Sequence, residues 1–352
     1  MKFRVTTLVL STAILLAACS KQDEAPAPAV EETTLEAVPL ANPAPQGKFY
    51  ITNQEGPISI YSLADYSKLG EISVGKGGRG MGLVDDERLL AVAVPATNDI
   101  AIVDLATRAV VRRVPVGHNP ETVRVQGMLA YATLDPQTKG SPTKLAVIDL
   151  STGEKTWELD VGLQALGMEL SADGEHILVT HEANETISVH ELETGKLLKT
   201  IETREYGIRP RGIARSPDGD YFAVTLEYGN KILILDRDYT ITQEIPTGEV
   251  PYGISYNRTG TEIFVALARG KAVQVFNTET LELKREIPIG ERCLHFSLTP
   301  DDKNLVVACG RSNNVLVLNA ETGELVKELP EPDRAPWGVM MLPKSVGSLS
   351  SP

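Results

Sequence analysis

Short apolar runs rich in β-branched and aromatic residues recur from about residue 48 to residue 342, and turn-forming residues separate them. The clearest stretch places the turn Ser216-Pro217-Asp218-Gly219 between runs at 211–215 and 221–225, and a third run follows at 231–236. Pro, Asp and Gly in this order favour a type I turn. The runs have the length and the residue types of strands. The stretch therefore predicts strand, tight turn, strand, loop and strand.

This unit repeats along the chain. Turns of the same kind stand at 171–174, 257–260 and 299–302. A second marker ends the third strand of each unit and recurs in steps of 41 to 45 residues, at Ser62, Asp104, Asp149, Glu191, Asp236, Asn277 and Asn319. Seven units of four short strands are typical of a β-propeller. We predict an all-β, seven-bladed β-propeller with four antiparallel strands per blade; a long β-sandwich, the alternative, explains seven phased repeats less well.

The first unit has only three strands, at 48–52, 57–62 and 68–74, and a fourth run stands at the far end of the chain, at 337–342. Pairing these segments would remove two open sheet edges. We therefore predict that one C-terminal and three N-terminal strands close the ring. The prediction gives a propeller over 47–343 and a disordered tail over 344–352, with the inner strand of the second blade at about 79–84.

The N-terminal region differs from the repeats. Lys2 and Arg4 precede an apolar run that is too short to span a membrane, and Cys19 follows Leu16-Ala17-Ala18. This ending resembles the bacterial lipobox. We predict a lipoprotein signal peptide over 1–18 and lipidation of Cys19; an ordinary signal with an incidental cysteine is the alternative.

Residues 19–46 are rich in Pro, Ala and Glu and lack periodicity, which predicts a tether. Ser20 after the cysteine favours the outer membrane, facing the periplasm, over the inner membrane. The net charge of −13 argues against nucleic acid as a partner and against adsorption to an anionic bilayer, which leaves the lipid on Cys19 as the anchor. We expect a monomer whose partner is an envelope protein or a small ligand.

Cys293 and Cys309 fall on the first and second strands of the last blade. A hairpin turning through Pro300-Asp301-Asp302 would place them opposite each other. A periplasmic compartment permits a disulfide, but directly paired cross-strand bridges are often strained. A disulfide and a pair of free thiols both remain open.

A search for catalytic motifs finds no Cys-x-x-Cys-His, no His-Glu-x-x-His, no paired-cysteine zinc spacing and no Gly-x-Ser-x-Gly. We therefore predict no catalytic residue, no metal site and no cofactor, and we lean against an enzyme. His181-Glu182 and His190-Glu191 are interpreted as solvated residues, because a strand period does not bring them together.

The inner strands indicate a different site. One aligned position, which we expect at the mouth of the central channel, is occupied by Trp337, Arg79, Glu121, Leu166, Arg211, Tyr252 and Leu294. The next position is Gly in five blades, as crowding of the strands at the axis requires. In the last blade this position is His295. Arg79, Glu121, Arg211, Tyr252, His295 and Trp337 therefore form a candidate site for a small anionic or planar ligand. A purely structural salt-bridge cluster is the alternative.

Tyr50-Ile51-Thr52-Asn53 and the segment from Arg209 to Gly219 carry a family likeness. The chain resembles YVTN-repeat seven-bladed propellers over about 48–342. More distantly it is similar to the propeller chains of amine dehydrogenases and to the haem propeller of nitrite reductase. The repeat implies the fold but not the function.

Two functions are compatible with these features. The first is a lipid-anchored, non-catalytic binding or scaffold module of the bacterial envelope. The second, which the distant resemblance implies, is an accessory or catalytic propeller of a periplasmic redox system, and only this alternative calls for haem or a quinone.

Overall fold

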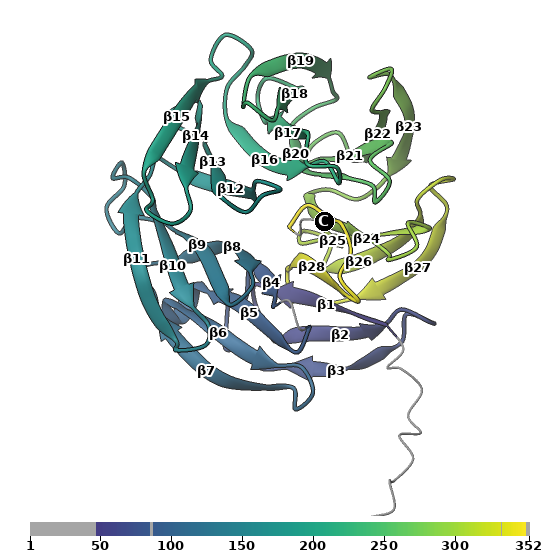
Figure 1. The fold of residues 1–352 in the computed structure, drawn as a ribbon. Helices are drawn as coiled ribbons and strands as arrows, with labels where there is room; N and C mark the ends of the chain where they lie inside the picture. The colour runs from purple at the N-terminus through teal and green to yellow at the C-terminus, as the bar shows by residue number, and fades with distance from the viewer. Residues whose placement is uncertain (1–46, 85–86, 332, 350–352) are drawn as a thin grey trace, which may run out of the picture. The chain divides into compact units, whose positions relative to one another are not determined.

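The computed structural model describes residues 47–84, 87–331 and 333–349. These residues form seven four-stranded antiparallel sheets, arranged as blades around a central axis (Figure 1). The predicted seven-bladed, all-β propeller is confirmed. Within the described ranges the only helix is a short 3-10 turn, Pro95–Thr97, so no helix there has the length and apolar character needed to cross a membrane.

The strand bounds follow, with the innermost strand of each blade first. Blade one consists of β28 (Pro336–Leu342), β1 (Lys48–Asn53), β2 (Ile58–Ser62) and β3 (Lys68–Ile72). Blade two consists of β4 (Met81–Leu83), β5 (Leu89–Val94), β6 (Asp99–Asp104) and β7 (Ala109–Pro115). Blade three consists of β8 (Pro120–Gln126), β9 (Leu129–Leu134), β10 (Lys144–Asp149) and β11 (Glu154–Asp160). Blade four consists of β12 (Ala165–Leu170), β13 (His176–His181), β14 (Thr186–Glu191) and β15 (Leu197–Glu202).

The remaining blades follow the same plan. Blade five consists of β16 (Pro210–Arg215), β17 (Tyr221–Leu226), β18 (Lys231–Asp236) and β19 (Ile241–Pro246). Blade six consists of β20 (Pro251–Tyr256), β21 (Glu262–Leu267), β22 (Ala272–Asn277) and β23 (Leu283–Pro288). Blade seven consists of β24 (Cys293–Leu298), β25 (Asn304–Cys309), β26 (Asn314–Asn319) and β27 (Leu325–Pro330).

The predicted ring closure is also confirmed. β28 pairs antiparallel with β1, with Lys48 opposite Leu342 and Ile51 opposite Val339. Purple and yellow strands therefore share one sheet in Figure 1. The pairing uses main-chain groups at both ends of the chain that would otherwise form open edges.

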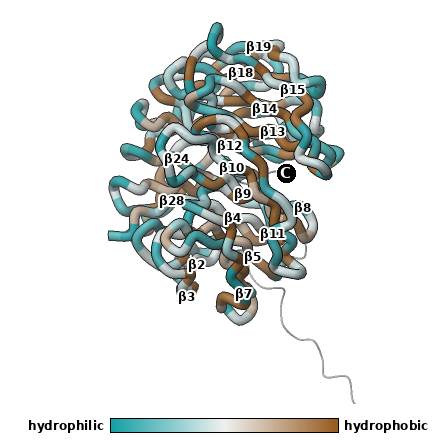
Figure 2. Tube along the Cα trace, turned by 90° about the vertical axis from the view of Figure 1, so that its left-hand side faces the viewer, coloured by the Kyte–Doolittle hydropathy of each residue, from teal (hydrophilic) through white to brown (hydrophobic). Residues whose placement is uncertain are grey.

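The core lies between neighbouring blades. Both faces of each middle strand meet another sheet, so strands such as β5 and β17 are apolar at nearly every position and do not alternate. Outer strands such as β27 keep most side chains exposed. Figure 2 shows brown segments along many of the strands and teal at many of the loops.

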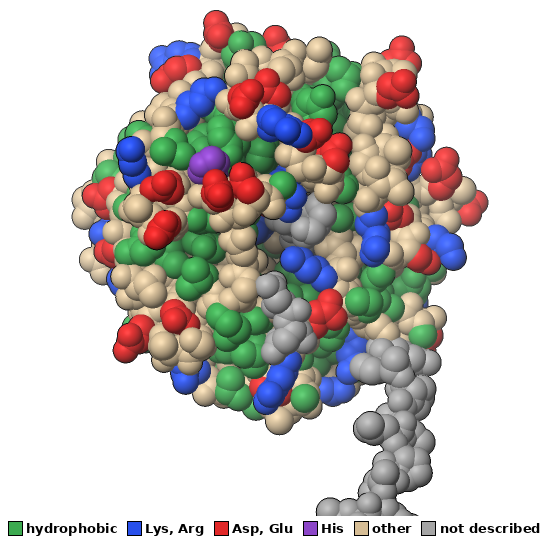
Figure 3. Space-filling model, viewed as in Figure 1, with side chains coloured by type: hydrophobic (Ala, Val, Ile, Leu, Met, Phe, Trp, Pro, Cys, Tyr) green, Lys and Arg blue, Asp and Glu red, His purple; other side chains and the backbone are tan. Residues whose placement is uncertain are grey.

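The surface is acidic on balance but mixed in detail. Figure 3 shows one face of the ring, on which acidic and basic side chains are spread over all the blades. The net charge of −13 therefore does not appear on this face as one continuous acidic area.

One predicted boundary is wrong and one is refined. The inner strand of blade two was expected over about 79–84; β4 occupies the middle of this range, and the N–H of Gly80 turns away from β5 to donate to the carbonyl of Glu121 in the next blade, at 2.9 Å. The tail was expected to be disordered from residue 344, yet residues 345–349 are buried.

The tail is ordered because it adds main-chain pairing to the inner strand β24. Gly347 bridges to Ser297, and Ser348 Oγ accepts a hydrogen bond from the Phe296 N–H at 3.1 Å. The segment lies near the centre of the ring, beside β24 and β28, in Figure 1. Residues 350–352 lie outside the described residues, as do the predicted signal peptide, Cys19 and the tether.

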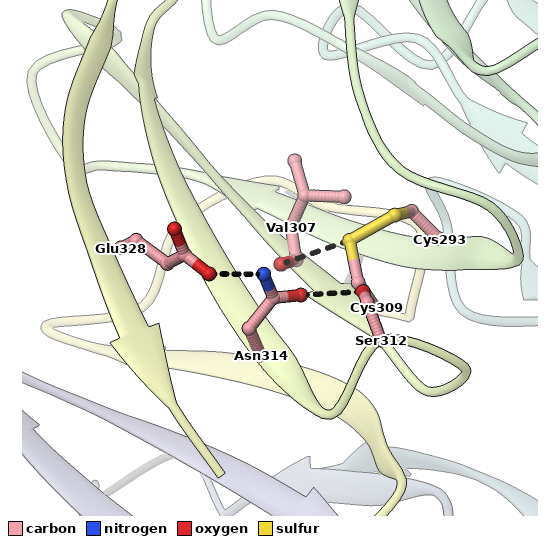
Figure 4. The surroundings of a disulfide bond; sticks show 6 residues. All are labelled: Cys293, Val307, Cys309, Ser312, Asn314 and Glu328. Carbon is pink, nitrogen blue, oxygen red and sulfur yellow. Dashed lines mark hydrogen bonds between the residues drawn. A yellow bond between two sulfur atoms is a disulfide. The ribbon is translucent and has the colours of Figure 1, made fainter.

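Cys293 and Cys309 face each other across β24 and β25 and are joined by a disulfide (Figure 4). Both cysteines are fully buried. The bridge closes a loop with a sequence separation of 16 residues. It fixes the start of β24, immediately after Arg292, at the end of the ring where the candidate site lies.

We expect truncation to separate the closing strand from the tail. A chain ending after Pro330 lacks β28 and leaves β1 as an open edge, so it should aggregate and lose cooperative melting. A chain ending after Leu342 keeps β28 and should remain a folded monomer with a lower melting temperature. Melting followed by circular dichroism and size-exclusion chromatography test both; identical behaviour of the two truncations would contradict the closure.

Candidate ligand site at the mouth of the central channel

The six predicted site residues lie together. A cavity of about 360 Å³ opens at one end of the central channel, and residues from all seven blades line it. They include every predicted member: Arg79, Glu121, Arg211, Tyr252, His295 and Trp337. The aligned strand position therefore corresponds to one place in space.

A backbone turn brings these side chains to the mouth. Two residues before each mouth position the chain takes a left-handed conformation, with φ between 47° and 89°, at Gly77, Asn119, Gln164, Arg209, Val250, Arg292 and Ala335. In six blades the register between the innermost and second strands then shifts at or beside the mouth position. Such bulges re-aim a side chain, and here they turn the mouth residues over the channel.

The predicted ring of small residues has a steric cause. A Cβ at Gly167, Gly212 or Gly253 would come within 3.0 Å of the main-chain carbonyl of the mouth residue in the next blade. Blade three has Thr122 instead, and its hydroxyl donates to the Leu166 carbonyl at 2.6 Å. In blade seven, the imidazole of His295 stands beside Trp337, with ring centroids 4.3 Å apart.

Sequence reasoning missed the threonines that hold the bulges. Thr225 Oγ1 accepts from the Gly212 N–H at 2.8 Å and donates to the Tyr252 carbonyl at 2.9 Å. Thr180 makes the same two contacts in blade four. Thr52 and Thr133 accept the corresponding N–H in blades one and three. Thr52 belongs to the Tyr-Ile-Thr-Asn repeat. The repeat therefore contained this threonine, but nothing in the sequence showed that its hydroxyl holds the bulge.

A charged cluster occupies one side of the mouth. The guanidinium of Arg211 pairs with Glu182 and lies 3.2 Å from Glu227 Oε2, and Arg209 bridges the same two carboxylates. Glu182 is only 3% exposed. Burial raises its pKa, and the two arginines oppose that shift. Across the mouth, Arg79 pairs with Glu121.

This cluster corrects two expectations. The aligned position supplied one carboxylate to the predicted site, Glu121, but Asp135 and Glu182 also line the cavity, and Glu227 pairs with the same arginines as Glu182. His181-Glu182 was interpreted as solvated, and both residues are buried, as is His190. Aligning the residue after each second strand would have found the carboxylates, because Asp135, Glu182 and Glu227 share that position.

An aromatic row continues from the charged cluster. The Arg211 guanidinium stacks 3.9 Å from the Tyr252 ring centroid. Tyr252 meets His295 edge-on at 5.4 Å, and His295 meets Trp337. His295 Nδ1 contacts Ser348 Oγ at 3.2 Å, whereas its Nε2 has no hydrogen-bond partner among the described residues.

The floor of the cavity is a buried charged group from blade three. Arg124 donates to the carbonyl of Leu349 in the C-terminal segment and lies 3.7 Å from Glu169 Oε2. Arg124 and Leu349 also line a second cavity, of about 180 Å³, farther along the channel. The C-terminal segment and Arg124 therefore stand between the two cavities.

The arrangement combines the two hypotheses for the mouth. Most arginines that line the cavity have a carboxylate partner, as the hypothesis of a structural salt-bridge cluster requires. The cavity nevertheless remains open, as the hypothesis of a ligand site requires. Within the described ranges, Arg292 is the arginine of the lining with no ion pair. The same part of the chain holds no group of His, Cys, Asp or Glu that could bind a metal ion.

A family model described as Lactonase, 7-bladed beta-propeller matches residues 133–243. This match runs from the end of β9 into β19 and includes the Glu182, Arg209, Arg211 and Glu227 cluster. No protein with a curated description matches the chain in sequence.

Solved structures share the fold at low identity. A protein of unknown function from Desulfotomaculum acetoxidans has a TM-score of 0.72 and 18% identity, covering 84% of this chain and 98% of its own. A putative 6-phosphogluconolactonase from Bacteroides uniformis has a TM-score of 0.70 and 15% identity, covering 84% and 99%. Hydrazine synthase from Kuenenia stuttgartiensis has a TM-score of 0.66 and 19% identity, covering 77% and 91%. At these identities the likeness shows the fold alone.

Buried histidines should make stability depend on pH. Burial, aided by Arg211 and Arg124, lowers the pKa of His295 to about 3, and burial lowers the pKa of His181 to about 4. Because an unfolded histidine titrates at about 6.5, the unfolded chain binds more protons below that pH. Each histidine should therefore remove up to about 1.4 kcal/mol per pH unit as the pH falls from 6.5 toward its folded pKa.

Urea unfolding between pH 7 and pH 4.5 measures this effect. His295→Asn should flatten the pH dependence, whereas His118→Asn, at an exposed histidine, should leave it unchanged. A His295→Asn profile parallel to that of the unchanged protein would contradict the assignment.

Proposed function

We propose that the protein is a lipid-anchored propeller of the bacterial envelope that binds a small planar anion at the mouth of its channel without transforming it. The observation that carries the proposal is the cavity of about 360 Å³, which combines an aromatic row with an arginine that has no ion pair among the described residues. Ligand sites of this kind are concave, mostly apolar and supplied with a few convergent polar groups.

The aromatic and charged parts have separate roles in this proposal. Trp337 and Tyr252 offer ring faces and edges to a planar group, and aromatic contacts of this kind are worth about 1 kcal/mol beyond area burial. Arg292 and the 27% exposed side chain of Arg79 face an anionic substituent. Arg211 is held by Glu182 and Glu227, so it supports Tyr252 rather than adding free positive charge.

Hydrolysis of a lactone is a second candidate. The family match favours it, because residues 133–243 include two carboxylates beside two arginines at the mouth. Glu182 and Glu227 are engaged by Arg209 and Arg211. Asp135 also lines the mouth within the matched segment; it accepts a hydrogen bond from Asn119 at 2.7 Å and has no ion pair among the described residues, so it is the carboxylate that this candidate would use as a base. Pure protein that hydrolyses glucono-1,5-lactone, with loss of the activity in Asp135→Asn, would place this candidate first. A redox role with haem or a quinone, and membership of the YVTN-repeat family, stay predictions.

Binding can be tested with a planar probe. We expect naphthalene-1-sulfonate to bind saturably in isothermal titration calorimetry and naphthalene-1-methanol, its neutral counterpart, to bind less tightly. Trp337→Leu should weaken binding of the sulfonate about tenfold, because it removes the aromatic contact. Trp157→Leu is the matched control, since Trp157 lies on the outer strand β11. Equal affinities for both variants, or no saturable binding, would overturn the proposal.

The lipid anchor has its own test. Cys19 stands after Leu16-Ala17-Ala18, as lipidation requires, so cells grown with labelled palmitate should label the unchanged protein. Cys19→Ser should abolish the label and release the protein from the membrane fraction. Cys293→Ser with Cys309→Ser should leave labelling intact. A Cys19→Ser protein that still incorporates palmitate would contradict the anchor.

A further inference from the structure

The mouth of the channel is continuous with a basic area on blades six and seven. A neighbouring cavity of about 520 Å³ is lined by Arg211, Tyr252, Arg292 and Leu294, which also line the mouth, and by further loop residues. Four cations belong to this area, which we call the rim patch: Arg269, Lys271, Arg292 and Arg311.

Loops that join neighbouring strands at the mouth end of the blades bring the rim patch together. Arg269 and Lys271 lie between β21 and β22, Arg292 lies just before β24, and Arg311 lies between β25 and β26. Arg292 and Leu294 line three cavities: the mouth, the 520 Å³ cavity, and a smaller one of about 260 Å³ beside Trp337. Arg292 therefore stands where the three cavities meet.

The rim patch carries more positive charge than its surroundings balance. Glu291 is shared by Lys271, at 2.9 Å, and Arg311, at 3.4 Å. Arg269 and Arg292 have no ion pair within the described ranges. The remaining carboxylate of the cavity lining, Glu227, is engaged by Arg209 and Arg211. Four cations thus face one shared carboxylate, in a chain whose net charge is −13.

Single exposed ion pairs contribute little and are screened by salt. Lys271 and Arg311 are 58% and 66% exposed, so a ligand with one charge would gain little from either of these two. A ligand with several charges would contact several cations at once, and the contributions would add. The geometry of the rim patch suits such a ligand.

We propose that the rim patch is a second subsite of the mouth, and that the ligand is a small planar molecule bearing two or more acidic oxygen groups. This inference rests on the proposed function of the mouth. The planar part lies against Trp337 and Tyr252, and the acidic groups extend over Arg292 toward Arg269 and Arg311. Carboxylate and phosphate groups share the required chemistry.

The test compares probes that differ in charge. Naphthalene-1-sulfonate carries one charge and naphthalene-1,3,6-trisulfonate carries three. In calorimetry at low salt, the trisulfonate should bind about tenfold more tightly, and this advantage should shrink as salt is added. 1-Naphthyl phosphate and naphthalene-1,2-dicarboxylate, which carry about two charges each, then distinguish phosphate from carboxylate as the preferred group.

The patch variant is Arg269→Ala with Arg311→Ala, because neither residue lines the mouth. It should remove most of the advantage of the trisulfonate and leave the affinity for the monosulfonate unchanged. Lys196→Ala with Arg237→Ala removes the same charge from exposed turns of blades four and five and should change neither affinity. Glu291→Gln should act in the opposite direction and tighten trisulfonate binding.

The outcomes separate the two proposals. If the monosulfonate binds but the trisulfonate gains nothing, or keeps its gain in the patch variant, the rim patch is not a subsite and the mouth site stands. If the trisulfonate depends on the rim patch but not on Trp337, the two areas do not share one ligand and the inference is overturned. If neither probe binds, both proposals fail.

Discussion

The seven inner strands approach a single axis very closely. At most positions of the ring of small residues, a side chain larger than that of glycine would meet the main chain of the next blade. Gly167, Gly212 and Gly253 meet this constraint by lacking a Cβ, and Thr122 meets it by donating a hydrogen bond. The hydroxyl of Thr225 connects the bulge of its own blade to the carbonyl of the next one. Because the same bulges aim the mouth residues, the packing at the axis also determines the geometry of the candidate site.

The charged residues at the mouth therefore stabilise the fold, whether or not they also bind a ligand. Glu182 is nearly inaccessible to water, and a buried carboxylate of this kind needs its arginine partners. Arg211 holds Glu182 on one side and stacks on Tyr252 on the other. The recognition that we propose falls to residues less engaged in the cluster: Trp337, Arg292 and the rim patch.

The repeat made the fold and half of the site predictable. Since the period places one residue of each blade at the same height, the members from Arg79 to Trp337 could be found by alignment alone. The carboxylates Glu182 and Glu227 follow the second strand, where no turn signal draws attention to them. Arg124 points into the channel from inside a strand, and its partner, the Leu349 carbonyl, carries no side-chain signal. The left-handed residues before each inner strand are mostly not glycine, so their conformation is imposed by the tertiary structure.

Ring closure has a consequence for the order in which the protein is made. β1 is the first strand of the propeller to leave the ribosome and β28 is the last of its strands, so blade one remains a three-stranded sheet until β28 has been made. Every other blade is complete in sequence within a single unit and can form from local contacts. Joining β1 to β28 requires the longest loop closure in the propeller, which is the kind of step that slows folding. The inner edge of β1 therefore stays unpaired while the other six blades are made, and it belongs to the blade that directly follows the predicted tether in the sequence.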